Sequence, residues 1–249
     1  MRRISVIALG LVLGSGACLD ESETSVGPQF ASSAATGEAG TASYRVTVSN
    51  LTAGQPLTPP LAAIHRSPVH LFEMGQPASF EVQQIAENGN LDPMIEALGQ
   101  SQHVDAVVVT QGPTLPPVLP SESVTFVVTG DTGAKYLSIV AMLICTNDGF
   151  TGVDAQRLPK RIGDTVTIDA VAYDAGTEMN TEDFADLVPP CAPLTGVAST
   201  DSGTGASNPA LAEGGIVRVH TGIEGDDDLQ VGIHGWDSPV ATIEIERIG

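Results

Sequence analysis

The chain has 249 residues, of which 30 are Asp or Glu and 10 are Lys or Arg, so its formal net charge at pH 7 is −20. This excess of negative charge argues against nucleic acid as a partner, because few basic side chains are available to neutralise phosphates. It also argues against unaided binding to anionic lipid. It is compatible either with a surface that binds cations or with a simple solubility adaptation.

Residues 1–18 have the pattern of a secretory signal: a basic start at Arg2 and Arg3, an apolar run, and small residues before Cys18. The apolar run ends well short of the roughly 20 residues that a membrane-spanning helix needs. Cys18 stands where a bacterial lipoprotein signal peptidase leaves a lipid-modified cysteine. We therefore expect a lipid anchor there, with ordinary cleavage after Ala17 as the alternative. The expected location is the outer membrane or cell surface, and otherwise the periplasm or the medium.

Residues 19–43 are rich in Ser, Thr, Ala, Gly and Glu and have no apolar periodicity. Such a segment cannot bury enough surface to offset its ordering entropy, so it is predicted to be a flexible tether. The remaining residues, 44–249, are predicted to form one β-rich domain.

Period-two alternation and short apolar runs predict strands over most of this domain. The predicted strands are 44–49, 104–110, 123–129, 136–145, 165–173, 215–220 and 241–247. Strands of this number and length, separated by Gly- and Pro-rich turns, predict an all-β fold, an antiparallel sandwich. Helical spacing predicts two short helices, one over 77–87 and one beginning at Asp92, which we expect to plug an edge or end of the sandwich. Residues 198–210 are predicted to be a disordered insertion.

The chain contains three cysteines. With Cys18 assigned to the signal or to a lipid, Cys145 and Cys191 are predicted to form a disulfide in an oxidising compartment. The alternative is two buried free thiols.

Two oxygen-rich loops each follow a predicted strand and contain Asp148 and Asp174. If both loops lie at one end of the sandwich, their oxygens can surround a hard cation such as Ca²⁺, which prefers six to eight oxygen ligands. Glu178 lies close enough along the chain to join them, and Asp154 is a weaker candidate. The alternative is that the aspartates only stabilise turns by accepting backbone N–H groups.

Six short motifs follow one another along the chain: NLT-GQPLTPP from Asn50, LFEMGQPAS, IAENGN, TNDGF, YDAGTE and WDSPVATI. Their order resembles the spondin domain, an extracellular adhesion-type module, over roughly Tyr44 to Gly249. The resemblance implies a C2-like β-sandwich with bound calcium. It also implies that Asp148 and Asp174 are the acidic residues of two motif loops, and that Glu178 stands at a position that is usually acidic in animal members.

Other patterns carry weaker signals. The acidic run 224–228 is predicted to be a solvated hairpin tip. His220 and His234 flank this run, but a zinc site needs three or four ligands and none accompanies them. Trp236 is predicted to be a core anchor at the entry to the last strand. No nucleophile motif of the G-x-S-x-G kind is present, and aromatic residues amount to 4 %.

The sequence therefore predicts an exported, non-catalytic module of adhesion or recognition type that uses Ca²⁺. Its expected partner is a protein or glycan at the cell surface, with contact to a membrane only through a lipid at Cys18. Two alternatives remain open: a secreted hydrolase that uses surface carboxylates, and a purely structural envelope domain.

Overall fold

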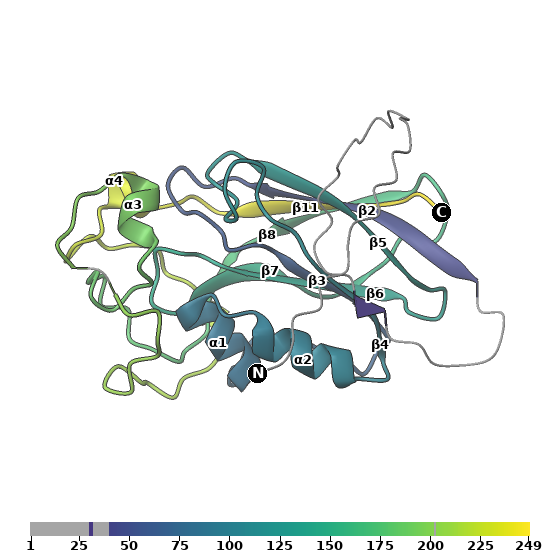
Figure 1. Ribbon diagram of the computed structural model, residues 1–249, viewed down its shortest axis with the longest axis horizontal. Helices are drawn as coiled ribbons and strands as arrows, with labels where there is room; N and C mark the ends of the chain where they lie inside the picture. The colour runs from purple at the N-terminus through teal and green to yellow at the C-terminus, as the bar shows by residue number, and fades with distance from the viewer. Residues whose placement is uncertain (1–29, 32–39, 202) are drawn as a thin grey trace, which may run out of the picture.

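The computed structural model describes residues 30–31, 40–201 and 203–249. Two antiparallel sheets pack face to face, and helices α1 and α2 lie along the outer side of one of them (Figure 1). The long segment between β9 and β11 gathers at one end of the molecule, away from the carboxyl terminus. The predicted all-β sandwich is confirmed. The predicted signal, most of the tether and Cys18 lie outside the described residues.

The larger sheet has seven strands in the order β1-β4-β3-β6-β7-β9-β10. These strands are β1 (Phe30–Ala31), β4 (Val104–Val109), β3 (Leu61–His65), β6 (Tyr136–Met142), β7 (Gly149–Arg157), β9 (Ala172–Asp174) and β10 (Arg218–Val219). All five residues of β3 are buried, because sandwiched layers cover both faces of this strand. A strand buried on both faces shows no alternation, which is why the sequence pattern did not predict it.

The smaller sheet has four strands in the order β5-β2-β11-β8. They are β5 (Ser123–Asp131), β2 (Thr41–Asn50), β11 (Ala241–Arg247) and β8 (Thr165–Ala170). Burial alternates along β2, with every second side chain buried, as expected for a sheet that has one face in the core and one in solvent. This alternation is the reason that the sequence pattern located β2, β5 and β11 well.

Two apolar cores lie on the two faces of the seven-stranded sheet. The core between the sheets includes Val46, Ile64 and Ile243, all fully or almost fully buried. The second core lies between the sheet and helices α1 (Phe80–Asn88) and α2 (Asp92–Gln100), and includes Ile85 and Val140. The prediction that the two helices plug an edge or end is therefore wrong. They cover part of a face, and the long segment after β9 covers more of it with side chains such as Phe184 and Leu187, because that face is apolar and must be shielded from water.

The predicted strand 165–173 is in fact two strands that belong to different sheets. β8 ends at Ala170 and pairs with β11, whereas β9 begins at Ala172 and pairs with β7. The period-two pattern continues through Val171 because both pieces bury one side, so no local signal marks the change of sheet. This crossing places the end of β9 beside the start of β7.

Several other predicted boundaries differ from the structure. The predicted strand 215–220 is reduced to the two residues of β10, and the predicted 136–145 strand ends at Met142. Two short helices, α3 (Cys191–Thr195) and α4 (Val231–His234), were not predicted. In the described part of the chain, no helix combines the length and the apolar composition that crossing a membrane requires.

Cys145 and Cys191 form a disulfide, with a Cα–Cα distance of 5.1 Å. Both residues are fully buried in the second core. The predicted bridge is confirmed over the alternative of two free thiols. It attaches α3, and with it the long segment after β9, to the end of the central strand β6.

Candidate functional site

The structure brings Asp148 and Asp174 together at one end of the sandwich. Asp148 immediately precedes β7, and Asp174 is the last residue of β9. Gly149 and Asp174 are Cα partners in the antiparallel pair of β7 and β9. The backbone N–H of Ala175 also donates to the carbonyl oxygen of Asp148, over 3.1 Å. The two acidic loops are therefore neighbours.

Asp148 is fully buried, and only one of its two carboxylate oxygens has partners. Oδ2 accepts hydrogen bonds from the backbone N–H groups of Thr177 (2.7 Å) and Glu178 (3.1 Å), and from the Thr177 hydroxyl. Oδ1 is buried and has no hydrogen-bond partner. Burial, together with the nearby Asp174 carboxylate, raises the pKa of Asp148 to about 6, although the hydrogen bonds from Glu178 and Thr177 act in the other direction. An unpaired buried charge of this kind is costly unless a cation or a proton balances it.

Asp174, in contrast, is fully paired. Its Oδ1 accepts the backbone N–H of Gly176 (2.8 Å), and its Oδ2 accepts the side-chain amide of Asn180 (3.0 Å) and a guanidinium N–H of Arg218 (2.9 Å). Arg218 also binds Glu213 at 2.7 Å. Sequence reasoning missed Arg218, because the 44 residues that separate it from Asp174 give no local signal of the contact.

Glu178 takes part in this site through its backbone, and its side chain bonds elsewhere. Its N–H donates to Asp148, but its Oε1 accepts the backbone N–H of Asn208 at 2.6 Å. Among the described residues, Asp148, Asp174 and Glu178 do not form a group whose ligand oxygens all lie within 4.8 Å of one another. The contact with Asn208 also shows that part of the predicted disordered insertion 198–210 packs against Glu178. Gly203, in the same segment, is buried and donates its N–H to the carbonyl oxygen of Phe184.

The turn after β9 requires glycine at position 176. Gly176 has φ of 70°, and a Cβ atom there would lie 2.5 Å from the backbone nitrogen of Ile216. We expect Gly176→Ala to lower the free energy of unfolding by about 2 kcal/mol, from left-handed strain and this clash together. Gly163 is the matched control, because its φ is 88° but nothing lies within 4 Å of its added Cβ.

Urea denaturation of both variants measures the difference. Gly163→Ala should cost only the conformational strain, about 1 kcal/mol. Equal losses in the two variants would mean that the close approach to Ile216 is absent.

The two histidines flanking the acidic run do not form a joint site. His220 is packed edge-on against Trp236, which is half-buried next to the core between the sheets, and burial lowers the His220 pKa. His234 lies beside the disulfide, and one of its ring nitrogens is within 4.8 Å of both sulfurs. Those sulfurs are bonded to each other and are not thiolates, so the group is not a zinc site as it stands. The acidic run itself is mostly exposed and forms a loop before α4, where a hairpin tip was predicted.

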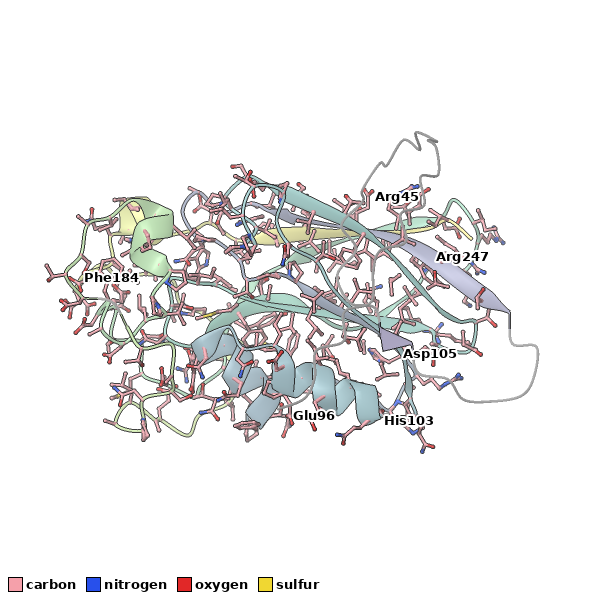
Figure 2. All side chains as sticks on the ribbon, in the orientation of Figure 1. Arg45, Glu96, His103, Asp105, Phe184 and Arg247 are labelled. Carbon is pink, nitrogen blue, oxygen red and sulfur yellow. A yellow bond between two sulfur atoms is a disulfide. The ribbon has the colours of Figure 1, made fainter. Side chains whose placement is uncertain are left out.

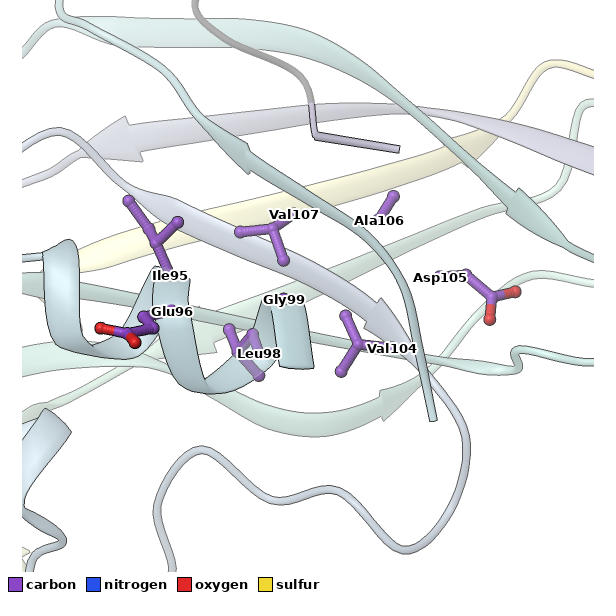
Figure 3. Close-up of a pocket in the computed structure, with 8 residues that line it drawn as sticks. All are labelled: Ile95, Glu96, Leu98, Gly99, Val104, Asp105, Ala106 and Val107. Carbon is purple, nitrogen blue, oxygen red and sulfur yellow. The ribbon is translucent and has the colours of Figure 1, made fainter. Parts of the chain in front are cut away.

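An apolar cavity of about 280 Å³ lies between α2 and β4, far from the acidic loops. Ile95 and Leu98 from the helix and Val104 and Val107 from the strand line it (Figure 3). Figure 2 shows the separation of the two regions: Phe184 marks the end with the long loops, whereas His103 and Asp105 mark the opposite end. This cavity holds none of the predicted site residues.

The groups around Asp148 fit a hard cation. The donor set is oxygen, and the unpaired Oδ1 leaves a place for one ligand bond. Within the described part of the chain, the ion pairs neutralise Asp174 through Arg218 and leave Asp148 without a basic partner. A positive charge that would balance the Asp148 carboxylate is therefore missing at this end of the sandwich.

Comparison with known proteins gives one family match and no curated relative. The family model described as Spondin_N matches residues 53–189, which is more than half of the chain. No curated protein matches the sequence. The matched region begins in the loop before β3 and ends two residues before α3. It includes strands β3 to β9 and the three residues Asp148, Asp174 and Glu178. The chain therefore belongs to the spondin amino-terminal domain family.

Proposed function

We propose that this protein is an exported, non-catalytic recognition module of adhesion type, in which a Ca²⁺ ion at Asp148, beside Asp174, orders the loops that a partner contacts. The observation that carries the proposal is the fully buried, unpaired Oδ1 of Asp148 beside a second carboxylate. Ca²⁺ would supply the missing positive charge there and accept additional backbone or water oxygens. Its expected partner is a protein or glycan at the cell surface.

Export is supported by two features of the chain. The family is of extracellular type, and a disulfide between buried cysteines is typical of proteins that fold in an oxidising compartment. Residues 30–31 and 41–43 of the predicted tether 19–43 belong instead to strands β1 and β2 of the domain. We propose further that Cys18 carries a lipid and that the chain between Cys18 and β1 joins this lipid to the domain. This arrangement would present the acidic loops to the outside.

The burial of the acidic side chains supports a non-catalytic role. A hydrolase that uses two carboxylates needs them to face each other across a cleft that admits substrate. Asp148 and Asp174 are 0 % and 2 % exposed, so no substrate reaches either of them. Domains of this family are also generally not enzymes.

Removal of calcium tests the ion site. If free Ca²⁺ is a hundredfold above its Kd, binding stabilises the fold by about 2.7 kcal/mol. For a domain of this size, we expect a chelator to lower the Tm by about 5–10 °C. Thermal unfolding with calcium, with chelator, and with chelator followed by excess calcium measures the effect and its reversibility.

An unchanged Tm in all three conditions, together with no metal in the purified protein, would contradict the ion site. If calcium raises the Tm but partner binding is equally strong with and without it, the ion serves stability alone. That result would favour the structural envelope domain over the recognition module.

A further inference from the structure

The apolar cavity between α2 and β4 lies along one edge of strand β4. Four consecutive residues of this strand, from Val104 to Val107, line it together with the second half of α2 (Figure 3). Successive side chains of a strand point to opposite faces of a sheet, so a cavity that all four residues line runs along the edge of the strand. Strand β3 occupies the other edge of β4. The cavity is therefore on the edge where β1 pairs.

Strand β1 pairs with the same part of β4 that lines the cavity. Phe30 is the Cα partner of Val107, and Ala31 is the Cα partner of Ala106. Both of these β4 residues belong to the lining. The cavity is thus continuous with a contact that the amino-terminal part of the chain makes with the domain.

The residue types around β1 suit an apolar cavity. Residues 26–31 read Val-Gly-Pro-Gln-Phe-Ala and carry no charge, whereas the acidic residues that precede them lie within 20–23. Phe30 is the largest apolar residue of this stretch, and the register places it at the rung of Val107. The exposed Glu96 stands in the lining, so an uncharged segment also avoids repulsion there.

We propose that residues 26–31 cover this cavity and thereby clip the amino-terminal part of the chain to the edge of β4. Phe30 supplies the apolar surface for the cavity, and the two rungs of β1 fix the register. The cavity volume of about 280 Å³ supports an occupant from the chain itself, because pockets for separate small molecules usually enclose about 300–1,000 Å³.

The clip shortens the connection between Cys18 and the domain. Residues 19–29 lie between Cys18 and β1, and a stretch of this length spans at most about 36–40 Å when it is fully extended. If β1 were not attached, residues 19–40 would connect Cys18 to β2, with a maximum span of about 73–79 Å. Because the clip roughly halves this reach, it restricts the orientations that the domain can take at a membrane.

The position of β1 would then decide which end of the domain faces the membrane. Asp105 is next to the rungs of β1 and marks the end opposite the long loops (Figure 2). A lipid at Cys18 would hold this end close to the membrane and direct the loop of Asp148 away from it. This orientation rests on the lipid proposed above, whereas the clip itself does not.

Thiol labelling of the cavity tests the clip. In the exported chain with Cys18→Ser, a cysteine introduced by Ile95→Cys carries the one free thiol, because the other two cysteines are bridged. Ile95 lines the cavity. We expect Phe30→Asp to raise the rate at which iodoacetamide modifies this thiol about tenfold, because the cover is lost. Phe30→Leu keeps an apolar side chain and should leave the rate nearly unchanged.

Ala97→Cys is the matched control. Ala97 is exposed on the same helix and does not line the cavity, so its labelling rate should not respond to Phe30→Asp. Hydrogen exchange gives a second measure that needs no change at Ile95: the backbone amides of residues 26–31 should exchange about tenfold more slowly in the wild type than in Phe30→Asp. Circular dichroism verifies that each variant is folded.

Equal labelling rates of the Ile95→Cys thiol in the wild-type background, Phe30→Leu and Phe30→Asp would overturn the clip. Amides of residues 26–31 that exchange equally fast in the wild type and in Phe30→Asp would overturn it as well. If the common labelling rate falls as the protein concentration rises, a second copy of the chain covers the cavity and the proposal is wrong.

Energy transfer to a vesicle surface separates the clip from the lipid. The lipidated protein carries a fluorophore attached through Gly99→Cys, at the β4 end, or through Asp226→Cys, in the long loops, and binds phosphatidylcholine vesicles that contain an acceptor lipid. Nothing lies within 4 Å of a Cβ added at Gly99, so the label has room. Transfer should be stronger from position 99 than from position 226, and Phe30→Asp should reduce the difference. Equal transfer from both positions would overturn the orientation. Protein that does not bind the vesicles would contradict the lipid at Cys18, while the labelling rates still decide the clip.

Discussion

Replacing both Cys145 and Cys191 by alanine is expected to lower the free energy of unfolding by about 4 kcal/mol. The bridge joins residues that are 46 apart in sequence, and closing a loop of that length removes much of the conformational freedom of the unfolded chain. Alanine is the appropriate replacement, because both positions are fully buried and a serine hydroxyl would lack a partner there. Urea denaturation, with the m-value fitted separately for each protein, measures the loss.

Reduction of the wild-type protein provides the matched control. Dithiothreitol should shift the wild-type denaturation midpoint toward that of the double variant and should leave the double variant unchanged. We expect the loss to be concentrated in the segment after β9, which hydrogen exchange of the amides around Asp174 and Gly176 would report. A double variant as stable as the wild type would show that packing alone holds α3 against the sheet.

Asp148→Asn is expected to have opposite effects with and without calcium. In chelator at pH 7.5, the variant should be more stable than the wild type by up to about 3 kcal/mol, because a neutral amide removes a buried charge whose pKa is about 6. The amide oxygen can still accept the N–H groups of Thr177 and Glu178. With calcium, the wild type gains stability by binding the ion and the variant does not.

The pH dependence follows from the direction of the pKa shift. An unfolded aspartate loses its proton near pH 3.8, whereas folded, metal-free Asp148 keeps its proton up to about pH 6. Between these values the folded state holds the extra proton, so its stability falls as the pH rises. The difference between variant and wild type in chelator should therefore be near zero at pH 4, grow between pH 4 and 6, and level off above that.

Asp174→Asn is the control for this experiment. Asp174 is paired with Arg218 and Asn180, so its replacement leaves Arg218 with Glu213 alone and should destabilise the protein with or without calcium. Chemical denaturation of the three proteins across pH 4–8, in calcium and in chelator, gives the full comparison. If Asp148→Asn were less stable than the wild type in chelator at every pH, the buried charge at Asp148 would have to be balanced within the protein.

The strands that have one face in the core and one in solvent could be predicted, because the alternation of buried and exposed residues is a local property of the chain. β2, β5 and β11 bury every second residue, and the sequence located all three. The pairing of Cys145 with Cys191 was predictable for a different reason, since only three cysteines exist and Cys18 is predicted to belong to the signal or to carry a lipid. The proximity of Asp148 and Asp174 was predictable from the expectation that both loops follow strands at one end of a sandwich.

Other features depend on contacts between distant parts of the chain, and these only the tertiary structure decided. No local sequence pattern indicates the change of sheet at Val171, because β8 and β9 continue the same alternation of buried positions. Arg218 reaches Asp174 across 44 residues, and the Glu178 carboxylate accepts the backbone N–H of Asn208. The sequence shows which residues are of a type that can bind a cation. The direction of each side chain, however, follows from packing against elements that are far away along the chain.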